Sequence, residues 1–127
     1  MANFRQVKFN SPTESYASII HLSSAASYGA PGATHYSITK AGVEGFAKSI
    51  AKEYGAQRIR CNAIKPFFID TPLLDTLMTP ETRTLYESLP TLKRFGKPEE
   101  IAQLIYFLAT DASSYITGAS IDINGGF

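Results

Sequence analysis

The sequence predicts an α/β fold in which about three parallel strands are flanked by helices. Three observations support this: short apolar runs of strand length, longer segments with helical periodicity, and the alternation of the two along 127 residues. A strand, a helix and a second strand in that order imply a right-handed parallel crossover. A chain of this length can form one small domain with one core.

The first strand is predicted over residues 17–23, where two isoleucines lie at the centre of a short run between small residues. Ser23 and Ser24 then lie at its carboxyl end, which is where open parallel sheets bind ligands. Residues 25–35 are rich in alanine, glycine and serine and are typical of a loop. The domain is expected over 17–127, preceded by an irregular N-terminal segment, 1–16.

Residues 36–57 form the strongest predicted helix. Gly42 and Gly45 lie on a face of small residues, and each costs about 1 kcal/mol relative to alanine in a helix. We therefore expect another backbone to pack closely there. The apolar stripe at helical spacing consists of Val43, Phe46, Ala47, Ile50, Ala51 and Tyr54.

The remaining elements follow from length, alternation and start signals. Residues 58–65 alternate in polarity and predict the second strand. A long connection, 67–95, contains a helix start at 79–81, where proline and an acidic residue follow threonine. Residues 98–110 predict another helix with a buried stripe, and 119–123 predict a third short strand.

Tyr36 and Lys40 are four residues apart at the start of the predicted helix, so they share one helix face. A tyrosine normally has a pKa of about 10, and a nearby cation favours the phenolate. The pair is therefore suited to general acid/base chemistry. The alternative is an ordinary surface pair, in which Lys40 binds Glu44 one turn further along.

Composition argues against several other classes of function. The net charge is +1 with both signs well mixed, which does not favour binding to nucleic acid or to a membrane surface. No apolar run approaches the roughly 18 residues of a membrane span. Cys61 is the only cysteine, so a reducing, cytoplasmic setting is expected. His21 and His35 lack metal-ligand spacing, and no metal site is predicted.

Several short motifs occur in an order and spacing that resemble a known family. From about residue 17 onward, the chain resembles the C-terminal half of a short-chain dehydrogenase/reductase, of the type that includes 3-oxoacyl carrier-protein reductases. That family has a Rossmann-like, doubly wound parallel sheet. The matching pieces are Ile19–Ser24 (IIHLSS), Tyr36–Gly42 (YSITKAG), Arg60–Ala63 (RCNA), Pro66–Pro72 (PFFIDTP), Gly96–Ile101 (GKPEEI), and Tyr115–Gly118 (YITG) with Asn124–Gly126 (NGG).

The resemblance implies a role for each catalytic residue. Tyr36 corresponds to the acid/base, and Lys40 to the residue that lowers its pKa and binds the nicotinamide ribose. A serine polarises the substrate carbonyl. The family's usual spacing to the tyrosine indicates Ser23, whereas the strand motif indicates Ser24. We favour Ser24, because strand register fixes the face to which a side chain points.

The resemblance also implies an NAD(P) cofactor, with Pro66, Ile69 and Thr71 at cofactor-binding positions. The N-terminal nucleotide-binding half of the family, including its glycine-rich phosphate turn, is missing from this sequence. The family's catalytic asparagine has no secure counterpart, since Asn3 lies too close to the serines. Phe67 replaces a glycine beside the cofactor, where a large ring is expected to obstruct it.

The predicted function is hydride transfer between NAD(P) and a carbonyl or alcohol, with Tyr36 as general acid/base. The leucines and methionine of residues 73–78 favour a small, apolar substrate. Three strands leave the first strand's outer edge unpaired, which favours a homo-oligomer or pairing with a full-length relative. The alternative is a truncated, non-redox family member that acts as a dimerisation or regulatory subunit, or as a cofactor-independent proton-transfer catalyst.

Overall fold

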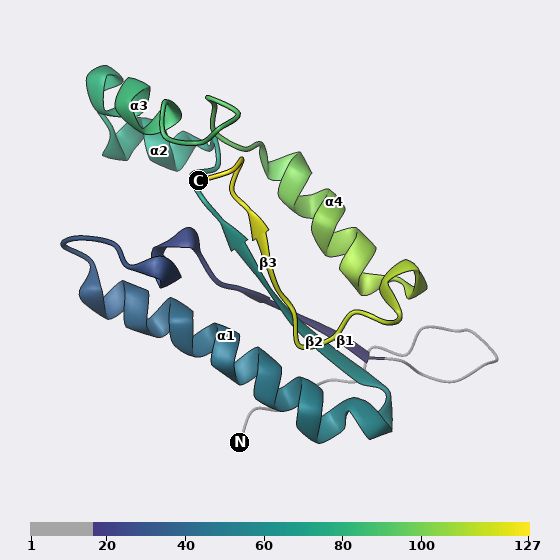
Figure 1. Ribbon diagram of the computed structural model, residues 1–127. Coiled ribbons are helices and arrows are strands. Elements are labelled where there is room, and N and C mark those ends of the chain that lie inside the picture. The colour runs from purple at the N-terminus through teal and green to yellow at the C-terminus, as the bar shows by residue number, and fades with distance from the viewer. Residues whose placement is uncertain (1–16) are drawn as a thin grey trace.

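The computed structural model of the protein describes residues 17–127, and the predicted irregular segment 1–16, with Asn3, lies outside them. The described residues form a three-stranded parallel sheet in the order β1–β2–β3 (Figure 1). The strands are β1 (Ala17–Leu22), β2 (Ile59–Pro66) and β3 (Ser120–Ile123). The predicted partial doubly wound sheet is thereby confirmed.

The central strand is the most buried part of the molecule. β2 is buried from Arg60 to its end, because β1 and β3 flank it and helices cover both of its faces. Asn62 is fully buried, and its side chain donates to the Ile116 carbonyl (3.0 Å) and accepts from the Ala119 amide (3.0 Å). This asparagine therefore fixes the turn that leads into β3.

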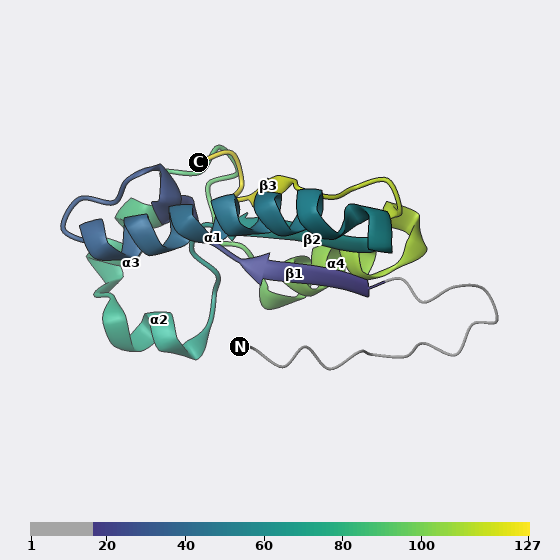
Figure 2. The same ribbon diagram turned by 90° about the horizontal axis from the view of Figure 1, so that it is seen from below.

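The sheet lies between two helices. α1 (Thr34–Tyr54) lies on one side of the strands and α4 (Pro98–Ala109) on the other (Figure 2). Small side chains let α1 approach β2 closely. The core cluster consists of Ala47, Ala51, Cys61 and Ala63, with Ile19 and Ile50 packed against it.

Some boundaries of the predicted elements were wrong by a few residues. α1 begins at Thr34, so Tyr36 lies within its first turn. The last predicted helical residues form a 3₁₀ turn, η2 (Gly55–Gln57). Arg58 follows in the left-handed region (φ 61°), which reverses the chain direction before β2 begins. A local backbone turn of this kind is not visible in the hydrophobic pattern.

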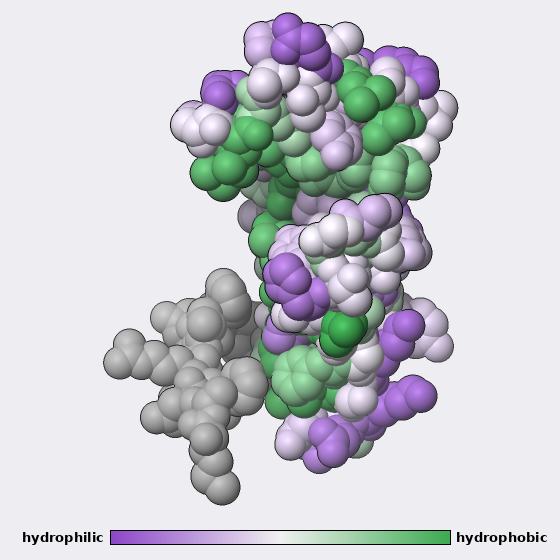
Figure 3. Space-filling model, turned by 90° about the vertical axis from the view of Figure 1, so that its left-hand side faces the viewer, coloured by the Kyte–Doolittle hydropathy of each residue, from purple (hydrophilic) through white to green (hydrophobic). Residues whose placement is uncertain are grey.

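The long connection contains two short helices beyond the carboxyl ends of the strands, α2 (Pro72–Leu77) and α3 (Pro80–Glu87). α2 was not predicted. Arg83 of α3 holds the segment together through carboxylates of Asp70 (2.7 Å), Asp75 (3.1 Å) and Glu87 (3.0 Å). In Figure 3, hydrophobic patches (green) lie among polar ones on this upper part of the molecule. The molecule narrows between this part and the start of α1 below.

The described chain leaves apolar surface uncovered, as expected. On α1, Ile38 is 68% exposed and Phe46 is 48% exposed. A Cβ added at Gly42 or Gly45 would meet nothing within 4 Å, so the predicted close backbone approach does not occur within residues 17–127. β1 is an edge strand of the sheet. In this part of the chain, no helix has the length and apolarity required to span a membrane.

Candidate active site

The carboxyl ends of β1 and β2 form one wall of an open hollow of about 350 Å³. The hollow brings together nearly all of the site residues predicted from the sequence. Thr71 is the exception, because it lies at the N-cap of α2 and is not part of the wall. The predicted residues in the wall are Ser23, Ser24, Tyr36, Lys40, Pro66 and Ile69.

Tyr36 and Lys40 lie on the same face of α1. The Lys40 ammonium is 5.5 Å from the centroid of the Tyr36 ring, which is 42% exposed. Lys40 Nζ donates to the Leu22 carbonyl at the end of β1 (2.8 Å). Glu44 pairs with a different lysine, Lys65, at 3.7 Å. An ammonium has three donors, so Lys40 can bind a further acceptor in the hollow.

The two neighbouring serines have different environments. Ser23 is buried, and its hydroxyl faces two acceptors of α1, the Lys40 carbonyl (2.9 Å) and the Glu44 carboxylate (3.2 Å). Ser24 is only partly buried and caps a one-turn 3₁₀ helix, η1 (Ala25–Tyr28), by accepting from the Ala26 amide (3.2 Å). The Ser24 hydroxyl proton therefore remains available to a ligand, whereas that of Ser23 is taken up by α1.

Phe67 lies between two hollows. Its ring stacks on that of Phe127, with centroids 3.9 Å apart and an interplanar angle of 16°. The ring is thus held against the C-terminal residue, and Phe67 lines both the hollow beside Tyr36 and a second one. The predicted effect of Phe67 on cofactor access stays a prediction.

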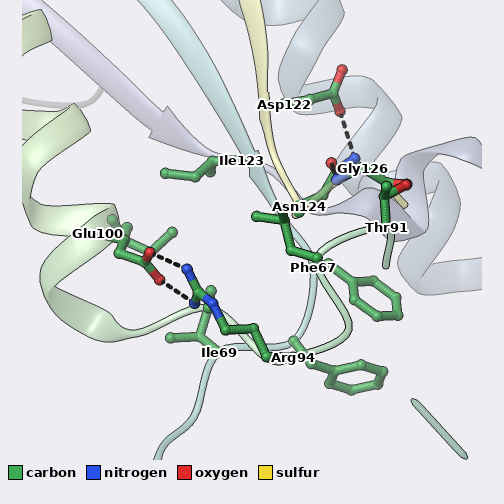
Figure 4. A pocket seen from close by; sticks show the side chains of 14 residues that line it. Phe67, Ile69, Thr91, Arg94, Glu100, Asp122, Ile123, Asn124 and Gly126 are labelled. Atoms are coloured by element: carbon green, nitrogen blue, oxygen red, sulfur yellow. Dashed lines mark hydrogen bonds and ion pairs between the residues drawn. The ribbon is translucent and has the colours of Figure 1, made fainter. Parts of the chain in front are cut away.

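The second hollow, of about 550 Å³, lies where the β3 end meets the connection before α4 (Figure 4). Its lining combines apolar side chains such as Ile123 with the backbone of the glycine pair at 125–126. In Figure 4, Arg94 and Glu100 pair through two hydrogen bonds, of 2.8 and 2.6 Å. This cavity was not predicted from the sequence, because its walls come from separate segments.

The pair of Arg94 and Glu100 fixes the start of α4. Glu100 Oε2 also accepts from the Lys97 amide at 2.7 Å, which satisfies a free N–H of the helix N-terminus. The hydrogen bonds from Arg94 and then from Lys97 lower the pKa of Glu100 to about 2. This carboxylate is therefore charged at neutral pH.

Gly96 sets the position of Ile69 in the hollow. The two residues form a β-bridge, in which the Gly96 amide donates to the Phe68 carbonyl (3.0 Å) and the Asp70 amide donates to Gly96 (2.8 Å). A Cβ at position 96 would lie 2.8 Å from Ile69 Cδ1. Any larger residue at 96 would therefore push Ile69 from its place.

An ionic cluster around the buried Lys65, which directly precedes Pro66 of the hollow, was not predicted. Lys65 of β2 is surrounded by Glu44 of α1 (3.7 Å), Asp122 of β3 (3.4 Å) and the hydroxyl of Tyr28. Burial alone would lower the pKa of Lys65, but the Tyr28 hydrogen bond and the two carboxylates outweigh it and raise the pKa. The available signal was a lysine at the carboxyl end of the second predicted strand, directly before Pro66.

A doubly wound parallel sheet with serine, tyrosine and lysine at its carboxyl edge is the arrangement of an α/β dehydrogenase. The comparison of the sequence with known families agrees. The model of the family described as Enoyl-(Acyl carrier protein) reductase matches residues 5–127. The chain belongs to this family, which is part of the short-chain dehydrogenases/reductases.

Similar proteins carry reductase names. A 3-oxoacyl-(acyl-carrier-protein) reductase of Thermotoga maritima is 50% identical over 110 residues, which is 86% of this chain and 44% of the relative. Its counterpart in Chlamydia trachomatis is 45% identical over 109 residues, 85% of this chain and 44% of the relative. The chain thus spans less than half the length of these relatives.

Solved structures show the same fold. A short-chain type dehydrogenase/reductase from Mycobacterium ulcerans matches with a TM-score of 0.83 and 32% identity, over 87% of this chain and 41% of that one. A 3-oxoacyl-(acyl-carrier protein) reductase from Brucella melitensis matches with a TM-score of 0.82 and 36% identity, again over 87% and 41%. The described residues therefore correspond to part of a larger fold.

Proposed function

We propose that this chain carries the catalytic part of an NAD(P)-dependent oxidoreductase that interconverts a carbonyl and an alcohol. The observation that supports this most directly is the shared hollow of Ser24, Tyr36 and Lys40 at the carboxyl edge of the sheet. Parallel α/β sheets bind their ligands at this edge. When bound, NAD(P) supplies or accepts the hydride.

In this proposal Tyr36 is the general acid of carbonyl reduction and the general base of the reverse reaction. Its hydroxyl gives a proton to the carbonyl oxygen as negative charge develops there, and takes it back in alcohol oxidation. The Lys40 ammonium lies near the ring and stabilises the phenolate that remains. It also offers a donor to the cofactor's ribose.

Ser24 is proposed as the residue that polarises the substrate carbonyl. Its hydroxyl accepts from the Ala26 amide and keeps its own proton for the substrate oxygen. A donor aimed at developing negative charge stabilises the transition state more than the ground state. Ser23 is unsuited to this role, because its hydroxyl is buried against α1.

The hollow fits the nicotinamide end of NAD(P). It is open, Lys40 can donate to the ribose, and Pro66 and Ile69 supply apolar wall. We propose that these residues hold this end of the cofactor, and that Thr71 joins them from the start of α2. The pyrophosphate requires a cradle of backbone amides, which we propose a pairing partner supplies.

The substrate is proposed to be a small, apolar carbonyl or alcohol compound. The α2–α3 segment presents Leu73, Leu77 and Leu85 as exposed side chains beyond the carboxyl edge of the sheet. Burying such side chains against a substrate is favourable by about 25 cal/mol per Å² of apolar area. Arg83 would keep the segment together while it covers the site.

We propose that the working form is an assembly in the cytoplasm. Members of the family are typically oligomeric. In this chain the exposed side chains of α1 and the edge of β1 offer surface for a second copy or a full-length relative. The presence of one cysteine, Cys61, is in keeping with a reducing compartment.

The test is a fluorescence titration of the purified chain with NADH and NADPH, alone and mixed with a full-length relative. We expect saturable binding at roughly micromolar cofactor in the assembled form. Lys40→Met should weaken it about tenfold through loss of a charge-assisted hydrogen bond. Lys52→Met, in the last turn of the same helix, is the matched control. A folded, assembled chain that fails to bind at millimolar cofactor would refute the proposal.

A further inference from the structure

The ionic cluster around Lys65 contacts β2, η1 and α1, which carry Pro66, Ser24, Tyr36 and Lys40 of the candidate site. We infer that Lys65 is a positioning residue, which holds Ser24 and the start of α1 in register through Tyr28 and Glu44. This inference deepens the proposed function and rests on it.

Lys65 is a buried lysine with charged and aromatic neighbours. Its side chain is only 6% exposed, and Asp122 is its direct neighbour across the β2–β3 pair. The ammonium lies 4.1 Å from the centroid of the Tyr28 ring and donates to the Tyr28 hydroxyl. The buried ammonium requires such partners, and it draws them in from the surface, because Tyr28 is 63% exposed and the Asp122 side chain is 41% exposed.

Tyr28 and Ser24 lie at opposite ends of η1. The Tyr28 hydroxyl donates to both carboxylate oxygens of Asp122 (2.9 and 2.8 Å), which ties the end of η1 to β3. The beginning of η1 is Ser24, whose side chain accepts from the Ala26 amide. One turn of helix therefore has the proposed carbonyl-binding serine at one end and the Lys65 cluster at the other.

Glu44 links α1 to both Lys65 and Ser23. One oxygen of Glu44 pairs with Lys65, and the other accepts from the buried Ser23 hydroxyl (3.2 Å). Ser23 also faces the Lys40 carbonyl (2.9 Å). The turn of α1 that carries Lys40 is thus linked to the end of β1, close to the Leu22 carbonyl that binds the Lys40 ammonium.

Lys65 therefore connects β2, β3, η1 and α1. Tyr28 is the link that can be removed most cleanly. Tyr28→Phe keeps the ring beside the ammonium and deletes only the hydroxyl that joins η1 to β3. The inference predicts that η1 loosens locally in this variant, while the rest of the domain stays folded.

The direct test is amide hydrogen exchange by NMR on the full chain. In Tyr28→Phe, the amides of Ala26 and Gly29, which close η1, should exchange at least about tenfold faster, because their local opening becomes easier. Amides of β2 should keep their rates. The matched control is Tyr106→Phe, a 73% exposed tyrosine on α4. Unchanged exchange at Ala26 and Gly29 would overturn the inference.

A second variant keeps the test decisive if the first disturbs folding. Asp122→Asn removes the charge that anchors Tyr28 and preserves the side chain's size. If both residues act through one link, the double variant should exchange no faster at Ala26 than either single variant. Additive increases in exchange rate would show independent effects and would also overturn the inference.

Turnover separates this inference from the proposed function. In the cofactor-binding assembly, Tyr28→Phe should lower kcat about tenfold and leave KM nearly unchanged, because Ser24 acts in the transition state. Faster η1 exchange in a protein without reductase activity would refute the proposed function but retain the ionic cluster, through its Tyr28–Asp122 link, as what positions η1. Normal exchange of the η1 amides in an active enzyme would refute the inference about η1 and retain the proposed function.

Discussion

Replacing each of the two adjacent serines by alanine should give opposite results for activity and stability. Ser24→Ala removes a hydroxyl that is partly buried in the hollow and whose structural contact is one amide at the start of η1. Ser23→Ala removes a buried hydroxyl that faces the Lys40 carbonyl and the Glu44 carboxylate. The first change should affect catalysis, and the second should affect folding.

The magnitudes follow from these contacts. Loss of one donor to the substrate's developing negative charge lowers kcat by about 100-fold or more, so Ser24→Ala should lose that much. Its cap contact closes only one 3₁₀ turn, and we expect a stability loss below about 1 kcal/mol. A hydrogen bond to a charged group contributes about 1.5–3 kcal/mol, so Ser23→Ala should lose about 2 kcal/mol of stability.

The assay pairs urea unfolding of each variant with the initial rate of NAD(P)H oxidation by a small apolar ketone, measured in the cofactor-binding assembly. Ser23→Ala should lower kcat by less than about tenfold at temperatures well below its unfolding midpoint, because Ser23 contacts Lys40 only through the α1 backbone. A 100-fold loss of kcat in Ser23→Ala with near-normal activity in Ser24→Ala would refute the assignment. Equal losses in both variants would refute the separation of roles.

Three further predictions concern the frame of the site. Asn62→Leu should cost about 3 kcal/mol in urea unfolding, because it leaves the partly buried Ala119 amide without its acceptor and the Ile116 carbonyl without its donor. The hydrogen bond from Arg94 lowers the pKa of Glu100 from 4.5 to about 2. The charged Glu100 side chain therefore stabilises the folded protein fully at neutral pH, and this stabilisation is lost as the pH falls toward 2. The urea unfolding midpoints of the parent and of Glu100→Gln should converge there. Cys61 is fully buried, and burial raises the pKa of its thiol; a thiol reagent should therefore react with it only after unfolding.

The fold was predictable because its strongest signals are local. The alternation of residues 58–65 and the helical stripe between 36 and 57 identified the central strand and α1 to within a few residues. Residues 67–95 were harder. α2 has six residues and is exposed along most of its length, so its leucines follow no clear period and its start at Pro72 was the only sequence signal.

The candidate site was predictable in its members but only partly in its contacts. The sequence allows a pair between Lys40 and Glu44, because the two are one turn apart on a helix. In the structure the Lys40 ammonium donates to the Leu22 carbonyl, and Glu44 pairs with Lys65 instead. These contacts depend on how β1 and β2 approach α1. Distances between elements of this kind cannot be derived from spacing within one element.

The parallel sheet also has a consequence for the rate at which the protein folds. Ala17 pairs with Ile59, 42 residues further along the chain, and Ala63 pairs with Ser120, 57 residues further. Each strand pair can form only after a long loop closes, and the entropy of closure is lost before any pairing energy is gained. Chains dominated by such distant pairings fold in roughly milliseconds to seconds. β2 is complete only after both neighbouring strands have paired with it, and until then its unpaired backbone edges are open to other molecules.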